Sequence, residues 1–141
     1  MHKTRFETMR LLVGSLFCCL VGSAYAQQDY RCVIERVESA EASPSYKAAQ
    51  KQLLGKEFTV ERRTGLMAGA LKNAYLTTPT VIDIGSRDNS YKVVNSLKLE
   101  QGAGRSTNAY LLTVMEFVDS ARKPFLFAEN YDAYFGTCTH F

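Results

Sequence analysis

Histidine, proline and tryptophan are scarce in this chain of 141 residues, which has two, three and none of them. With 46% hydrophobic and 22% charged residues, the composition excludes collagen-like, coiled-coil and disordered chains and is typical of a globular protein. Basic residues are spread along the chain, so it offers neither a footprint for nucleic acid nor a polybasic membrane anchor. We therefore expect a compact fold with no nucleic-acid partner.

A long apolar run occurs only near the start of the chain. Residues 11–21 are apolar, follow a basic segment and precede Ala24 and Ala26, which have the small size and spacing that signal peptidase reads. The run is shorter than the ~18 to 20 residues of a membrane span. We predict a signal peptide over residues 1–26 and a single domain over residues 27–141, periplasmic or secreted, with no membrane anchor after cleavage.

Cleavage removes two of the four cysteines and leaves Cys32 and Cys138 near the ends of the domain. An even number of cysteines in an exported protein favours a disulfide. The bond would close a loop of roughly a hundred residues, which the chain-entropy model values at about 4 to 5 kcal/mol. No Cys-X-X-Cys spacing suggests a redox or zinc role. We predict a structural Cys32–Cys138 disulfide that fastens the two edges of the sheet together.

Apolar and polar residues alternate with the period of two that is typical of strands over much of the domain. The predicted strands are 30–37, 58–62, 66–68, 81–84, 91–99, 109–117, 125–127 and 131–138. Ser43-Pro44 and the helical spacing of Tyr46, Ala49 and Leu53 predict one amphipathic helix that ends at Gly55.

Short loops between successive strands indicate an antiparallel meander. Together with the predicted disulfide, this favours a mainly β (α+β) fold. We expect a meander curled into a small barrel or sandwich, with the one N-terminal amphipathic helix packed over an opening.

Candidate catalytic groups are few. After cleavage His140 is the only histidine, and we expect it on the surface of the last strand. No cluster of histidine, cysteine and carboxylate has metal spacing, and the glycine-rich stretch 102–106 lacks the Walker spacing, so we predict neither metal nor cofactor. Glu116, which ends an apolar run, is the most interesting carboxylate because burial there would raise its pKa.

Eight tyrosines and eight phenylalanines are a high aromatic load for a small β fold. Tyrosine buries area and offers a hydroxyl, so these residues form either the core or a binding surface. The Arg62-Arg63 pair beside the predicted Thr64-Gly65 turn is the best candidate for an exposed basic spot. The candidate binding surface comprises Tyr75, Tyr91, Tyr110, Tyr134, Arg62 and Arg63.

The segment Tyr30-Arg31-Cys32 with the late Cys138 resembles the layout of periplasmic lysozyme inhibitors, which are small exported β-barrels with a terminal disulfide. Ser90-Tyr91-Lys92 partly resembles their inhibitory loop. The Ser-Gly-containing loop motif of that family is missing and the helix at Pro44 is extra, so the resemblance covers the architecture only.

Two functions follow as hypotheses. The first is a small exported, non-enzymatic protein of the bacterial cell envelope, a binding or inhibitor-like module whose partner is an envelope protein or a small apolar ligand. The alternative is a carboxylate-dependent hydrolase acting on envelope carbohydrate. It would use Glu116 and a second carboxylate roughly 5 to 10 Å away across a cleft.

Overall fold

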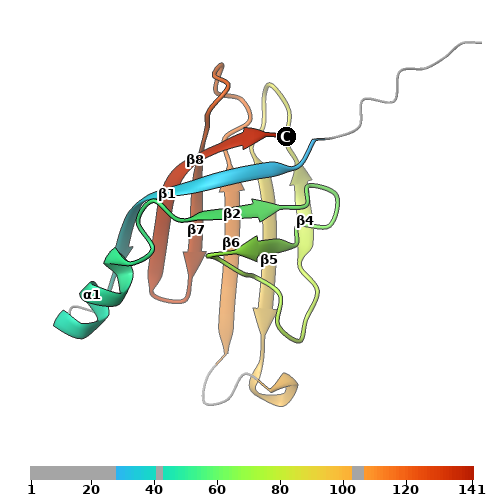
Figure 1. Cartoon of the computed structure of the whole chain (residues 1–141). Coiled ribbons are helices and arrows are strands. Elements are labelled where there is room, and N and C mark those ends of the chain that lie inside the picture. Colours follow the sequence, from blue (N-terminus) through green and yellow to red (C-terminus); the bar gives the residue numbers. More distant parts are fainter. Residues whose placement is uncertain (1–27, 41–42, 103–106) are drawn as a thin grey trace, which may run out of the picture.

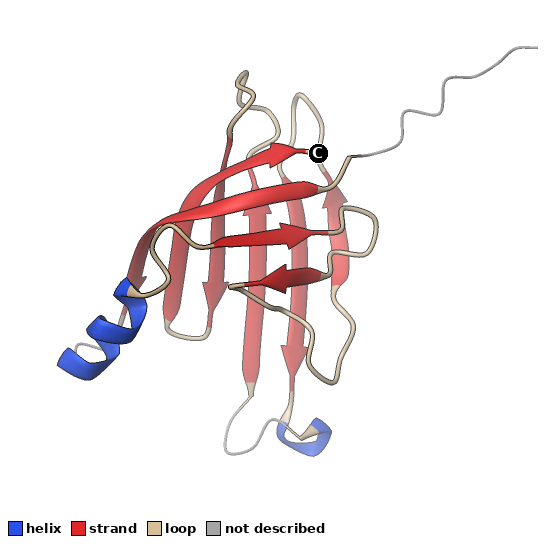
Figure 2. Ribbon diagram, in the orientation of Figure 1, coloured by secondary structure: helices blue, strands red, loops and turns tan. Residues whose placement is uncertain are grey.

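The structure is a computed structural model that describes residues 28–40, 43–102 and 107–141; the predicted leader lies outside these residues. Within them the chain is mainly β (Figures 1 and 2). The strands are β1 (Tyr30–Ser39), β2 (Glu57–Val60), β3 (Met67–Gly69), β4 (Thr80–Ile84), β5 (Tyr91–Leu97), β6 (Asn108–Val114), β7 (Lys123–Glu129) and β8 (Asp132–His140). Helix α1 (Pro44–Lys51) and the 3-10 turn η1 (Leu99–Gln101) complete the described elements.

The strands form one antiparallel sheet in the order β3-β2-β1-β8-β7-β6-β5-β4, which curls into a half-barrel. In Figure 1, β2, β3 and the first part of β1 cross in front of the strands β5 to β7. The prediction of a mainly β fold with an antiparallel, curled sheet is confirmed. Its edges are β3 and β4, and no ladder joins these two strands in the described part of the chain, so hydrogen bonding between strands does not close the barrel.

A sharp bend lets the sheet fold over itself. The register of β1 against β8 shifts between Ile34 and Arg36, which marks a bulge at Glu35. Gly136 lies opposite Ile34 at the same place, and its missing side chain lets the Val33 carbonyl approach closely. A bulge and a glycine facing one another therefore produce the curvature.

The Cys32–Cys138 disulfide is present, and the two cysteines are directly opposite each other in the β1–β8 ladder. The predicted bond is thus confirmed. The prediction that it fastens the edges of the sheet is wrong, because β2 and β3 extend the sheet beyond β1 while β7 to β4 extend it beyond β8. The disulfide crosslinks the middle of the sheet.

The core lies on the concave side of the half-barrel. Alternate residues of each long strand point inward, as in Tyr30, Cys32 and Ile34 of β1. Phe58 of β2 meets Phe125 of β7 edge to face at 5.2 Å between ring centroids, which joins the crossing layers. Each such fully buried large side chain contributes about 1.5 to 3 kcal/mol of hydrophobic free energy.

The connection from β3 to β4 is irregular, and a buried asparagine holds it. Asn73 accepts a hydrogen bond from the Met67 amide at 3.0 Å and donates one to the Gly65 carbonyl at 2.8 Å. The side-chain amide of Asn95, on β5, donates to the Asn73 carbonyl. The connection is therefore fastened both to the β2–β3 turn and to the strand that faces it.

The predicted amphipathic helix packed over an opening is not supported. In Figure 1, α1 extends away from the sheet beside the far end of β1. No described helix is long and apolar enough to cross a membrane.

The bend predicts an intolerance of side chains at Gly136. An added Cβ would lie 1.9 Å from the Val33 carbonyl oxygen and 2.9 Å from the Phe125 ring. We expect Gly136→Ala to lower the free energy of unfolding by about 3 kcal/mol or more, measured by urea denaturation. Gly55→Ala is the control, because its added Cβ meets nothing within 4 Å and adds only left-handed backbone strain of about 1 kcal/mol. Equal losses in the two variants would contradict this account of the bend.

Candidate functional site

The six residues predicted as a binding surface do not form one surface. Tyr91 and Arg62 are buried at one end of the half-barrel, and Arg63 beside them points into solvent with 86% of its side chain exposed. Tyr110 and Tyr134 are buried toward the other end, where Tyr75 is 60% exposed. The structure therefore divides the prediction between two sites.

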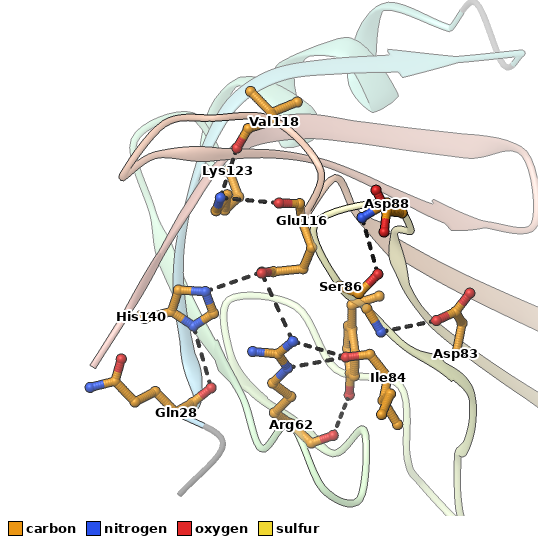
Figure 3. A network of polar contacts seen from close by, with 12 residues as sticks. Gln28, Arg62, Asp83, Ile84, Ser86, Asp88, Glu116, Val118, Lys123 and His140 are labelled. Carbon is orange, nitrogen blue, oxygen red and sulfur yellow. Dashed lines mark hydrogen bonds and ion pairs between the residues drawn. The ribbon is translucent and has the colours of Figure 1, made fainter. Parts of the chain in front are cut away.

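The first site is a buried polar cluster around Glu116 in the turn after β6 (Figure 3). The Glu116 side chain is only 9% exposed. Its carboxylate lies 3.1 Å from His140 Nε2, at the end of β8, and 3.9 Å from Arg62 Nη2, in the β2–β3 turn. His140 is therefore not the surface residue that the sequence predicts, because its ring packs inward against Glu116 and Tyr30.

Arg62 links this cluster to strand β4 at the opposite edge of the sheet. Its guanidinium donates two hydrogen bonds to the Ile84 carbonyl of β4, from Nη2 at 2.9 Å and from Nε at 3.3 Å. The Tyr91 hydroxyl donates to the Arg62 carbonyl at 2.9 Å. The guanidinium carbon lies 5.2 Å from the ring centroid of Tyr30 and 5.9 Å from that of Tyr91, within the range of cation–π attraction.

Burial dominates the chemistry of the two tyrosines in this cluster. It raises the pKa of Tyr30, and the neighbouring Glu116 raises it further. Burial likewise raises the pKa of Tyr91, although the adjacent Arg62 acts in the opposite direction. Both rings remain neutral phenols at physiological pH, so the charges of this site belong to Arg62, Glu116 and, when protonated, His140.

A polar hollow of about 630 Å³ adjoins Glu116 and is lined by Arg87, Glu116, Phe117, Val118, Asp119 and Lys123. The Lys123 ammonium donates to the Glu116 and Val118 carbonyls at 3.1 and 2.7 Å and so holds the turn. The Glu116 carboxylate contacts the side chains of Arg62 and His140 rather than a second acid. This arrangement fixes Glu116 in place and does not resemble the paired acids of a glycoside hydrolase.

The second site is a row of aromatic rings that runs from the core to the surface at the opposite end of the half-barrel. Tyr75 lies 6.2 Å from Tyr110, Tyr110 stacks on Phe127 at 6.3 Å, and Phe127 lies 5.8 Å from Tyr134. Of the four rings, only Tyr75 is largely exposed. Three of the predicted tyrosines thus come together here.

Two carboxylates accompany these rings, and the sequence reasoning missed both. Glu129 is directly opposite Tyr110 in the β6–β7 ladder and directly opposite Asp132 in the β7–β8 ladder. Cross-strand partners point to the same face, with Cβ atoms about 4.5 to 5.5 Å apart. Burial raises the pKa of Glu129. A usable signal exists in the sequence, because Glu129 continues the inward phase of Phe125 and Phe127.

Glu129 adds to the effect of burial on the tyrosines around it. Burial raises the pKa of Tyr75, of Tyr110 and of Tyr134, and the Glu129 charge raises each of the three further. Asp132 acts in the same direction on Tyr134. We name Tyr75, Tyr110, Tyr134, Glu129 and Asp132 the tyrosine–carboxylate site.

Three further features considered in the sequence are the Ser90-Tyr91-Lys92 segment, the glycine-rich stretch and a metal site. Ser90-Tyr91-Lys92 offers no protruding loop, since Tyr91 is fully buried in β5. The stretch 103–106 of the glycine-rich loop lies outside the described residues. Within the described residues, no group of three or more histidine, cysteine or carboxylate side chains is placed to hold a metal ion.

Comparison with known proteins gives no relative. No family model, no curated protein and no solved structure matches the chain.

The position of Arg62 predicts a large loss of stability when its charge is removed. Arg62→Met keeps an apolar stem but leaves the buried Glu116 carboxylate without its guanidinium. We expect the free energy of unfolding to fall by about 3 to 5 kcal/mol in urea denaturation. The adjacent exposed arginine is the control, and Arg63→Met should change the free energy by no more than about 0.5 kcal/mol. Similar effects of the two substitutions would show that Arg62 does not act through the cluster.

The raised pKa of Glu129 predicts a pH dependence of stability. Burial opposes ionisation of Glu129, so the neutral side chain is the form that favours folding. Its contribution to stability is fully present below the unfolded-state pKa and is lost as pH rises through the folded-state pKa. We expect Glu129→Gln to be more stable than the parent at pH 7 and equal to it below about pH 4. The exposed Glu100→Gln is the control in urea titrations from pH 3.5 to pH 8. A lower stability of Glu129→Gln at pH 7 would contradict the prediction.

Proposed function

We propose that this protein is a small exported module of the bacterial cell envelope that binds a partner protein and catalyses no reaction. The observation that carries the proposal is the row of rings in the tyrosine–carboxylate site, which continues from the packed core to the exposed Tyr75. Tyrosine is enriched among the residues that dominate binding energy, because one side chain contributes area and a polar hydroxyl.

The surroundings of Tyr75 support the same proposal. Leu76, Leu99 and Tyr131 are largely exposed in the neighbouring connections and turns. The side chain of Leu76 approaches Gly102 beyond η1, so these segments lie together. Exposed apolar side chains near packed aromatic rings suit the apolar core of a protein interface.

The hydrolase alternative has less support. Glu116 is fixed by Arg62 and His140, and Glu129 and Asp132 are neighbours on one sheet face rather than acids on opposite walls of a cleft. The disulfide is compatible with an oxidising compartment, as the proposed export requires.

Affinity capture with matched variants tests the proposal. The protein without residues 1–26 is immobilised and exposed to periplasmic extract, and retained proteins are identified by mass spectrometry. We expect one partner to be captured reproducibly, at least about tenfold less by Tyr75→Ala and unchanged by Phe117→Ala, an exposed aromatic residue of the other end.

Two results would overturn the proposal. The first is that no partner is captured, or that its capture is the same with Tyr75→Ala. The second is turnover of envelope glycans by the purified protein that is lost in Glu116→Gln, which would establish the hydrolase instead.

A further inference from the structure

A hollow of about 360 Å³ opens between the start of β4, the end of β5 and η1, which lie at the same end of the half-barrel (Figure 1). None of the described residues that line it is charged, in contrast to the hollow beside Glu116. Val94 is the one apolar residue of this lining. The others carry a hydroxyl or a side-chain amide and are Thr77, Thr78, Thr80, Asn95, Ser96 and Gln101.

Asn95 joins two sides of this hollow, the end of β5 and the connection that leads into β4. Its side-chain nitrogen donates to the carbonyls of Asn73 and Thr77. Its side-chain oxygen accepts from the Ser96 amide at 2.9 Å and from the Thr77 hydroxyl at 3.0 Å. The Asn95 amide therefore uses its full capacity of two donors and two acceptors within the fold, and it holds the hollow in shape.

Four further polar groups of the lining are available to a ligand. The hydroxyls of Thr78, Thr80 and Ser96 make no hydrogen bond to another residue in the described part of the chain, and all three residues are exposed. Gln101 is also exposed, and its side-chain oxygen accepts from the Lys98 amide at 2.9 Å, which leaves its NH₂ group as a donor.

These groups select the chemical class of the ligand. An ion would find no counter-charge in the lining, and an apolar molecule would find only Val94. A sugar ring carries several hydroxyls on adjacent carbons, each of which donates and accepts, as do the hydroxyls of the lining. The volume of the hollow lies within the range of about 300 to 1,000 Å³ that is typical of small-molecule sites.

We propose that this hollow binds a neutral sugar residue of a glycan. The proposal goes beyond the proposed function, because the hollow is a separate site and binds the sugar without reaction. The hydroxyls of Thr78, Thr80 and Ser96 exchange hydrogen bonds with those of the sugar. A peptide main chain is also neutral, but its side chains require apolar contacts that Val94 alone does not supply.

NMR titration with disaccharides tests the proposal. The probes are cellobiose and chitobiose, the neutral disaccharides of glucose and N-acetylglucosamine, and acetyl-trialanine methylamide represents a neutral peptide. We expect both disaccharides to shift the amide signals of Thr78 and Ser96 and the side-chain NH₂ signals of Gln101 saturably. The expected dissociation constant is about 1 to 10 mM, because the hollow is exposed and supplies few hydrogen bonds. The peptide should shift these signals at least about tenfold more weakly.

A variant without two of the hydroxyls provides a second measurement. Thr78→Val combined with Ser96→Ala should weaken binding of both disaccharides by at least about fivefold, because two hydrogen bonds to the sugar are lost. Thr139→Val is the control, since Thr139 is an exposed threonine of β8 outside the hollow, and it should leave binding unchanged. Well-dispersed NMR spectra verify that each variant is folded.

Three results would overturn the inference: no saturable shift with either disaccharide, equal affinity of the double variant and the parent, or tighter binding of the peptide than of both sugars. None of them bears on the proposed function, which is measured separately by capture of a partner with Tyr75→Ala.

Discussion

The half-barrel depends on the contact between the Arg62 guanidinium and the Ile84 carbonyl, which spans a seam that no backbone ladder closes among the residues the structure describes. β3 is only three residues long, so a ladder there would add few hydrogen bonds. One arginine can donate to a carbonyl, pair with a carboxylate and lie against two rings at once, since its planar head has five donors. The same side chain therefore orients the β2–β3 turn, the turn after β6 and the end of β8.

Tyrosine has different surroundings at the two ends of the molecule. At the Arg62 end, two tyrosine rings and the Glu116 carboxylate surround a cation that the chain itself supplies. At the Tyr75 end the rings continue to the surface and the carboxylates face one another. Charged contacts within the fold fix the side chains that make them, whereas an exposed aromatic ring is available to contact another molecule.

Local pattern predicts local structure in this chain, and it fails where distant strands decide the outcome. Alternation located the strands, and cysteine number indicated the disulfide. The position of the disulfide in the sheet depends on which side of β1 the β2–β3 hairpin joins, and alternation carries no information about that choice. The expectation of an edge-to-edge crosslink failed for this reason.

The alternation of inward and outward side chains along a strand explains why burial could be predicted for some candidate site residues and not for others. Tyr91 shares the inward phase of Val93, and Arg62 follows Phe58 and Val60 at intervals of two, so their burial was readable in the sequence. Tyr75 lies in an irregular connection, where no period indicates a direction. Its approach to Tyr110 requires the folded path of that connection, which Asn73 and Asn95 hold.

The central pairing of β1 with β8 also governs how the protein can fold. These strands are the first and the last of the described sheet, and their ladder runs from Tyr30–His140 to Ser39–Asp132. The middle of the sheet therefore cannot form until nearly the whole chain is available. Such non-local pairing is typical of folding in milliseconds to seconds rather than microseconds, because loop closure precedes the contacts that stabilise it. Before β1 pairs with β8, the β4–β8 meander, whose strands are neighbours in sequence, is the largest part of the sheet that can assemble on its own.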